Sequence, residues 1–458
     1  MDNDKTIDAT DLYDKVIVET KEEQIYDDIE EIDTKGNKKS TFWLISVFSA
    51  TGQFFFGNFF SAFAAEAGVS GGLMGFMTSI RNLLSSILQG NIGFLSDKIG
   101  RKLIMLIGMI LNFAITIPLL FFENIGLLIA VAIIQAFSLS IFIPAWNAVL
   151  GDVTKPAFRA TFIGRIASIG RLVSVSFSII IAIIFYLADV VYYGQEILGW
   201  TVNIPWRIQY SIAFGIAAFN SIICTILIFT MKETRIEDKE VKKPEMRVAF
   251  KDRSFMKFVI FYSLFGLSMS FMWPLNPIIQ VNVLNMEFYQ IAVITSVFTM
   301  VMSITQLFAG RLGDRIGRRP VFIVGGFILV LYPISQLPAI ITGNWLWQIL
   351  GNTIAGLGTG TFFVALGALT LDLAPEDLMG AYSGIREMFF GIATFIGSLS
   401  AGFLVDFLAK HFGLDNTTIY MCIGISILRV LAAIGFFFVA ESLPKEKRVN
   451  NHRTKIGK

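Results

Sequence analysis

Charged side chains inside long apolar runs are the residues of this chain best placed to do chemistry. Arg81 and Arg171 lie well inside such runs, and Glu387, next to Arg386, is the only carboxylate in a comparable position. A charge at the centre of a membrane helix costs roughly 2.5 to 3.5 kcal/mol unless it meets water, a partner or an anion. The excess of guanidinium groups favours an anionic ligand, held by paired hydrogen bonds. Hydrogen bonds from these arginines to neighbouring helices are the alternative.

Uncharged polar and aromatic residues in the same runs are further candidates for contact with a solute. Several recur at steps of three or four residues, which places them on one side of a helix. With Arg81 and Arg171, the candidates are Gln53, Gln135, Asn147, Trp273, Asn276, Gln280 and Asn352. Hydrogen bonding and close packing between helices are the competing interpretation. Proton coupling would need a carboxylate buried near the site, and Glu387 is the candidate.

Residues that bind metals or catalyse covalent chemistry are scarce. The two histidines, His411 and His452, lie in a loop and a tail, and Cys224 and Cys422 fall in separate apolar runs. No group has the spacing of metal ligands. The glycine-rich stretch 356–360 lacks the lysine of a phosphate-binding loop. We therefore expect no enzymatic activity, no metal, no cofactor and no nucleic-acid partner.

The elements that carry these residues are predicted to be membrane helices. Of 458 residues, 54% are apolar and 16% charged, against roughly a quarter charged in soluble domains. Windows of about 20 residues, the length that spans a bilayer, give twelve candidates. They cover approximately 42–65, 72–95, 103–122, 126–150, 160–187, 208–231, 256–280, 289–310, 320–341, 345–371, 381–408 and 417–440.

The distribution of Lys and Arg predicts the orientation. Of the 37 basic residues, 30 fall in the two tails and in the loops that follow even-numbered spans, all of which lie on one side of the membrane. Five lie inside spans, and Lys410 and Arg207 lie on the other side of the membrane. The positive-inside rule then places both termini, with Lys5 and Lys455, in the cytoplasm. We expect a multi-pass protein of the cell (plasma) membrane. The stretch from Tyr192 to Thr201 is expected on the outer side of that membrane.

A basic hairpin between apolar runs occurs twice. Residues 93–102 (GFLSDKIGRK) recur as residues 310–319 (GRLGDRIGRR), 217 positions later. This internal repeat, with the pattern G-x-x-x-D-[RK]-x-G-[RK]-[RK], resembles the signature loop of the major facilitator superfamily. Asp152 and Gly164 likewise match Asp372 and Gly384, and Lys232-Glu233-Thr234 is weakly echoed by Ala440-Glu441-Ser442. The resemblance covers about Phe42 to Leu443.

The resemblance implies both a fold and a role for the hairpins. Superfamily members have twelve helices in two pseudo-symmetric six-helix bundles, an all-α membrane fold with a midplane substrate site. Their first, fourth, seventh and tenth helices line the cavity, and the hairpin Asp braces the cytoplasmic side against the other half. The residues that would form this gating motif are Gly93, Asp97, Gly100, Arg101, Asp152, Arg159, Gly310, Asp314, Gly317, Arg318 and Asp372. Anchoring of the topology alone is the other reading.

The predicted domains follow from these assignments. Residues 1–41 form an acidic cytoplasmic tail, with 13 Asp or Glu against 6 Lys in the first 40 residues, a composition typical of disorder. Residues 42–231 form the N-terminal half and residues 256–443 the C-terminal half. A cytoplasmic linker, 232–255, connects them, and residues 444–458 form a basic cytoplasmic tail.

The sequence thus predicts a secondary active or facilitative transporter that works by alternating access. Its substrate would be a small solute, and the arginines within the spans favour an organic anion. Its other partners would be the lipid bilayer and a coupling ion, either a proton or sodium. We expect a monomer. A solute sensor of the same fold that does not transport, and an exporter of neutral or hydrophobic compounds, are the alternatives.

Overall fold

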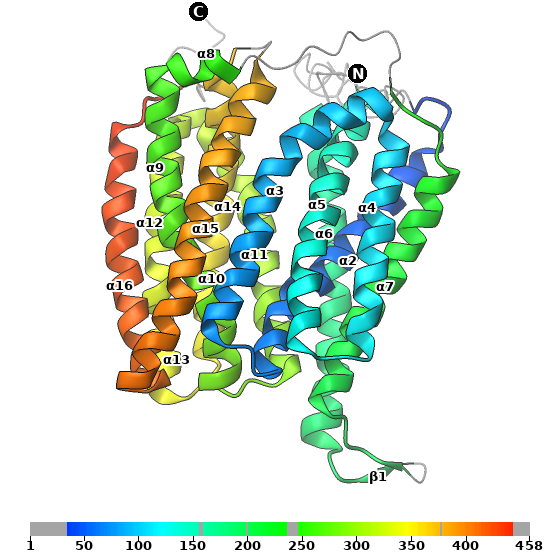
Figure 1. Ribbon diagram of the computed structural model, residues 1–458, viewed down its shortest axis with the longest axis vertical. Helices are drawn as coiled ribbons and strands as arrows, with labels where there is room; N and C mark the ends of the chain where they lie inside the picture. The colour runs from blue at the N-terminus through cyan, green and yellow to red at the C-terminus, as the bar shows by residue number, and fades with distance from the viewer. Residues whose placement is uncertain (1–33, 155–158, 198–199, 236–245, 376–377, 443–458) are drawn as a thin grey trace, which may run out of the picture.

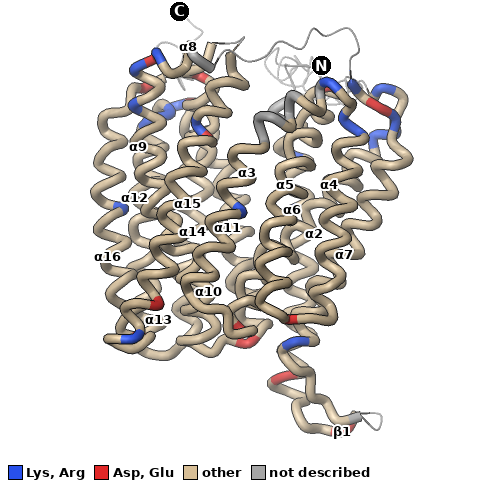
Figure 2. The backbone as a smooth tube through the Cα atoms, viewed as in Figure 1, with Lys and Arg blue, Asp and Glu red and all other residues tan. Residues whose placement is uncertain are grey.

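The computed structural model of the chain describes residues 34–154, 159–197, 200–235, 246–375 and 378–442. Long helices run side by side in one bundle (Figure 1). We call the end where α2 (Lys39–Glu66) begins and η4 (Gly435–Phe438) ends the terminal face, and the opposite end the far face. Lys and Arg gather mainly at the terminal face (Figure 2).

The N-terminal half continues from α2 through five further long helices. They are α3 (Gly71–Ile99), α4 (Arg101–Thr116) with the turn η1 (Ile117–Leu120), α5 (Ile125–Val153), α6 (Arg159–Tyr186) with η2 (Leu187–Val191), and α7 (Trp206–Thr230). Between η2 and α7, β1 (Glu196–Ile197) pairs antiparallel with β2 (Trp200–Thr201). This hairpin projects from the far face (Figure 1).

The C-terminal half repeats the arrangement with more interruptions. Its elements are α8 (Met246–Lys251), α9 (Arg253–Ser270), α10 (Met272–Ile278), η3 (Ile279–Val283), α11 (Phe288–Ile316), α12 (Arg318–Ser335), α13 (Leu337–Thr342), α14 (Trp347–Leu373), α15 (Met379–Phe412), α16 (Leu414–Ile434) and η4. The short helix α8 lies in the predicted linker, where no helix was expected.

The all-α prediction is confirmed, apart from the two-residue strands of the hairpin. Ten helical segments of the described residues are long and apolar enough to cross a membrane. The other two predicted spans correspond to α2 and α3, with 28 and 29 residues. Polar and small residues lower the hydropathy of these two helices, so composition supports ten of the twelve predicted spans.

Side-chain caps determine where several helices begin. Ser70 accepts from the backbone N–H of Leu73 at 3.4 Å, and Asn124 accepts from Gly126 at 2.8 Å. Asp252 accepts from Ser254 and Phe255, while Glu287 begins α11 with a capping box. Each satisfies N–H groups that have no acceptor within the helix.

The seventh span is broken near its middle. The helix α9 ends at Ser270, the chain continues after Phe271 as α10, and the span ends in the wide turn η3. Pro274 and Pro277 lack the N–H groups that would continue the helical ladder. The break brings α10 and η3 to the centre of the bundle, where α10 reaches both α2 and α3.

Buried apolar residues form one core shared by the two halves and two that belong to one half each. The shared core joins Phe59 and Met74 of the N-terminal half with Leu275, Phe288 and Val405 of the C-terminal half. Separate cores within each half lie closer to the terminal face. Ring contacts and hydrogen bonds between the halves, among the described residues, also lie at mid-depth or toward the far face. The halves are therefore closed together at the far face.

Candidate functional site

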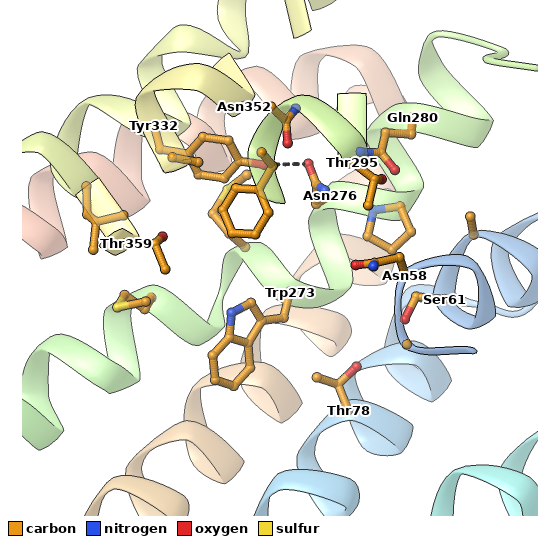
Figure 3. Close-up of a pocket in the computed structure, with 18 of the residues that line it drawn as sticks. Asn58, Ser61, Thr78, Trp273, Asn276, Gln280, Thr295, Tyr332, Asn352 and Thr359 are labelled. Atoms are coloured by element: carbon orange, nitrogen blue, oxygen red, sulfur yellow. Dashed lines mark hydrogen bonds between the residues drawn. The ribbon is translucent and has the colours of Figure 1, made fainter. Parts of the chain in front are cut away.

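A cavity of about 390 Å³ lies at the centre of the bundle, between the two halves (Figure 3). Residues of α2, α3, α9, α10, η3, α11, α12, α14 and α16 contribute to its wall. Its polar and aromatic lining consists of Asn58, Ser61, Thr78, Arg81, Asn82, Trp273, Asn276, Gln280, Thr295, Phe298, Tyr332, Asn352, Thr359 and Arg429. Such a mixture suits a small solute with both polar and apolar parts.

Five of the predicted binding residues line this cavity: Arg81, Trp273, Asn276, Gln280 and Asn352. Three of them come from the broken seventh span, because α10 and η3 run along the cavity wall. The Tyr332 hydroxyl donates to Oδ1 of Asn276 at 2.9 Å (Figure 3). That bond fixes the Asn276 side-chain amide and leaves its amino group as a donor.

Four predicted binding residues lie away from the cavity. Arg171 donates to Oε1 of Gln306 in the C-terminal half at 2.5 Å. Gln135 is buried on α5, Asn147 is exposed on the same helix, and Gln53 is half-buried on α2. Among the described residues, α5 contributes nothing to the cavity lining. The expectation that the fourth helix lines the cavity is therefore corrected for this structure.

The cavity wall is positively charged. Arg81 and Arg429 both line it, and no Asp or Glu stands among its described lining residues. Arg81 has no hydrogen-bond acceptor among the residues that the structure describes, whereas Arg429 donates to the carbonyls of Leu329 and Met269 at 2.6 and 3.2 Å. An anion in the cavity would therefore meet one uncommitted guanidinium group and one held in place.

The sequence did not reveal several lining residues. Tyr332 on the ninth span and Arg429 on the twelfth were not expected to face the centre, and Asn58 was overlooked beside Gly57. Arg429 donates to two backbone carbonyls, which hold its guanidinium group against α9 and α12. The available signal was its cost: a buried arginine in an apolar helix requires a specific environment.

Glu387, the candidate proton site, lies outside the lining of this cavity. Its carboxylate pairs with the adjacent Arg386, and that arginine also donates to Thr370 Oγ1 at 2.6 Å. The contacts therefore describe a charged pair within the C-terminal half.

The duplicated hairpin folds the same way in both halves. Gly100 alone separates α3 from α4, and Gly317 alone separates α11 from α12, with φ of 123° and 109°. Residues that carry a side chain rarely adopt this backbone conformation, which explains why glycine occupies both positions. Gly310, seven residues before Gly317, lies within α11.

The charged residues of the hairpins pair within their own halves. Arg101 lies 3.1 Å from Asp152, and Arg318 contacts both Asp314 and, at 3.5 Å, Asp372. The side chains of Asp97 and Arg159, and the surroundings of Gly93, lie outside the described residues. The bracing of one half against the other by these motifs stays a prediction.

Glutamates cap the helix that follows each hairpin. Glu233 accepts from the backbone N–H groups of Arg101 and Lys102, both at 3.1 Å. Glu441 accepts from those of Arg318 and Arg319, at 3.0 and 3.5 Å. The weak sequence echo around these two glutamates thus reflects the same contact in each half, between the segment after the last helix and the start of the third.

Aromatic rings from both halves pack together between the cavity and the far face. Phe288 stacks on Phe59 with ring centroids 4.5 Å apart, and meets Phe185 and Tyr210 edge-on at 5.1 Å. Beside them, burial and then the charge of Asp189 raise the pKa of Glu287, the N-cap of α11. This aromatic cluster contains residues of both halves, so it must separate if the far face opens.

The fold and site define a multi-pass helical membrane protein with a central cavity between two repeated halves. The family model of the Major Facilitator Superfamily matches residues 42–273 and 258–456. The chain belongs to the Major Facilitator Superfamily.

Some similar proteins are named as transporters, and others are named for drug resistance. The chain is 24% identical to Multidrug resistance protein D of Escherichia coli over 38% of its length and 40% of that protein, and 36% identical to the Gentisate transporter of Corynebacterium glutamicum over 18% of each. These two matches span less than half of either relative. The Quinolone resistance protein NorA of Staphylococcus aureus is 22% identical over 81% of this chain and 88% of NorA. A solved mutant of the nucleoside transporter NupG shares the fold, with a TM-score of 0.69 and 12% identity over 87% of this chain and 99% of NupG.

Proposed function

We propose that this protein transports a small organic anion across the cell membrane by alternating access between its halves, 42–231 and 256–443. The observation that carries the proposal is the pair Arg81 and Arg429 in a cavity whose described lining holds no carboxylate. A planar guanidinium group binds a carboxylate bidentately, and Arg81 is uncommitted among the described residues. Trp273 and Phe298 offer flat apolar surface for the rest of the solute. The name of one relative, the Gentisate transporter, refers to an organic anion.

Matched pairs of solutes test the proposal. Purified protein in proteoliposomes would be offered benzoate, nicotinate and gentisate, each beside its primary amide, which keeps the ring and removes the charge. We expect at least one acid to accumulate while its amide does not. Equal transport of acid and amide would overturn the anion proposal. Binding of an acid without any uptake would favour the solute sensor.

Export of neutral or hydrophobic compounds is the second candidate. Met269, Met272 and Leu329 line the cavity beside the aromatic rings, and flexible methionines suit varied apolar ligands. Two relatives are named for drug or quinolone resistance. If this were the function, the protein would transport the amides of the matched pairs as well as the acids.

In either case we propose that the chain works without enzymatic activity and as a monomer, driven by a proton or sodium gradient or by the solute gradient itself. We further propose that α2 and α3 complete the twelve spans, and that the terminal face is cytoplasmic. The positive-inside rule supports that orientation, because the basic residues concentrate there (Figure 2).

Labelling of single cysteines checks the orientation. In a background with Cys224→Ala and Cys422→Ala, Lys38→Cys would mark the terminal face and Gln195→Cys the hairpin at the far face, both exposed positions. A membrane-impermeant maleimide applied to intact cells is expected to label Gln195→Cys alone. Labelling of Lys38→Cys alone would reverse the orientation.

A further inference from the structure

Two helices from opposite halves touch at the far face through glycines. A Cβ atom on Gly402 of α15 would collide with the carbonyl oxygen of Gly71 and lie 2.9 Å from Cα of Gly75, both on α3. Ser79 Oγ, one turn further along α3, donates to the carbonyl of Phe395 on α15 at 2.9 Å. Small residues let the two backbones approach this closely.

An aspartate lies at the end of this seam. Asp406 of α15 accepts from the backbone N–H of Gly71 through Oδ1 and from that of Gly72 through Oδ2, each at 2.8 Å. These are the first two residues of α3, whose N–H groups have no acceptor within the helix. The carboxylate thus adds two charge-assisted hydrogen bonds at the positive end of the helix dipole.

The position of this contact distinguishes it from the other helix caps. Glu233 and Glu441 cap helices of their own halves, so these contacts can persist however the halves move. Asp406 and Gly71 are separated by 335 residues and lie in different halves. Their contact can exist only while the far face is closed.

We propose that Asp406 is a conformational latch: its carboxylate holds the far face shut by capping α3 across the boundary between the halves, and releases α3 when that face opens. The proposal rests on the alternating-access function proposed above. A contact made in one state shifts the equilibrium toward that state by its differential free energy. The latch therefore favours molecules whose cavity is reached from the terminal face.

Asp406→Asn tests the latch, because it keeps the size of the side chain and one oxygen but removes the charge. We expect the ratio of far-closed to far-open molecules to fall at least about tenfold, which corresponds to ~1.4 kcal/mol. Spin labels on Asn124→Cys and Asn344→Cys, exposed far-face positions in opposite halves, report the far-face distance by double electron–electron resonance. Labels on Thr230→Cys and Lys251→Cys report the terminal face.

The expected signature is a longer far-face distance together with a shorter terminal-face distance, in protein reconstituted in lipid nanodiscs. Asp415→Asn is the matched control, since Asp415 is an exposed acid at the far face of the same half, on α16; it should leave both distances unchanged. Asp406→Ala provides a second variant if the amide misfolds, and should shift the distances in the same direction.

Three results would overturn the latch: unchanged distance distributions in both folded Asp406 variants, an equal shift in Asp415→Asn, or wild-type protein without a far-closed population. These measurements need no solute. A shift without transport of any solute would retain the latch and remove the transport proposal. Transport by the wild type, with no shift of the distances in the variants, would remove the latch and retain the transport proposal.

Discussion

Arg81→Gln is expected to weaken the binding of an acidic solute by at least about 1.5 kcal/mol, the low end for a hydrogen bond to a charged group, or roughly tenfold in Kd. Arg81 lines the cavity and has no acceptor among the described residues, so the wild-type guanidinium is free to bind a carboxylate. Glutamine keeps a polar side chain in the wall and removes the charge. Calorimetric titration with the transported acid of the matched pairs measures the change.

Arg171→Gln is the matched control for this prediction. Arg171 is also an arginine inside a span, but it is bound to Gln306 and lies outside the cavity lining. Its replacement should leave the affinity for the acid unchanged, whatever it does to the contact between the halves. If both variants lost affinity equally, or if folded Arg81→Gln bound the acid like wild type, the anion site would not be at Arg81.

Gly402→Val is expected to reduce transport at least about tenfold by preventing closure of the far face. The valine side chain would occupy the space of the Gly71 carbonyl and approach Gly75 across the seam, and neither backbone can move away while the halves stay closed. Overpacking of this kind destabilises the packed state. Uptake into proteoliposomes and the far-face spin-label distance measure the loss and its cause.

Gly424→Val supplies the comparison, because a Cβ atom at Gly424 on α16 would meet nothing within 4 Å. It should transport like wild type. Normal transport by Gly402→Val, or a far-face distance that still reports closure in this variant, would contradict the close packing of α3 and α15.

Local sequence signals predicted the elements and the repeat. Hydropathy and length place the helices, and the two hairpins turn at Gly100 and Gly317 as their common pattern indicates. The charged partners Asp152 and Asp372 were also found from their repeated spacing, and each lies against its own hairpin arginine. These features depend on residues close in sequence or on one repeated unit.

The composition of the cavity depends on helix rotation, which the spacing of residues within one helix does not determine. Gln135 and Asn147 have the residue types of a solute site, yet neither lines the cavity. Tyr332 and Arg429 do line it, from spans outside the four that the resemblance assigns to the cavity. The hydrogen bonds of Asp406 were equally hidden, because its partners are backbone groups more than 300 residues away.

The glutamate caps have a consequence for how such a chain can arise. Each half ties the end of its own last helix to its own third helix, through Glu233 at Arg101 and Glu441 at Arg318. Neither cap uses an atom of the other half. A single ancestral gene segment that encoded one half would already carry this closure, so its tandem duplication could double the unit without inventing new contacts at the terminal face.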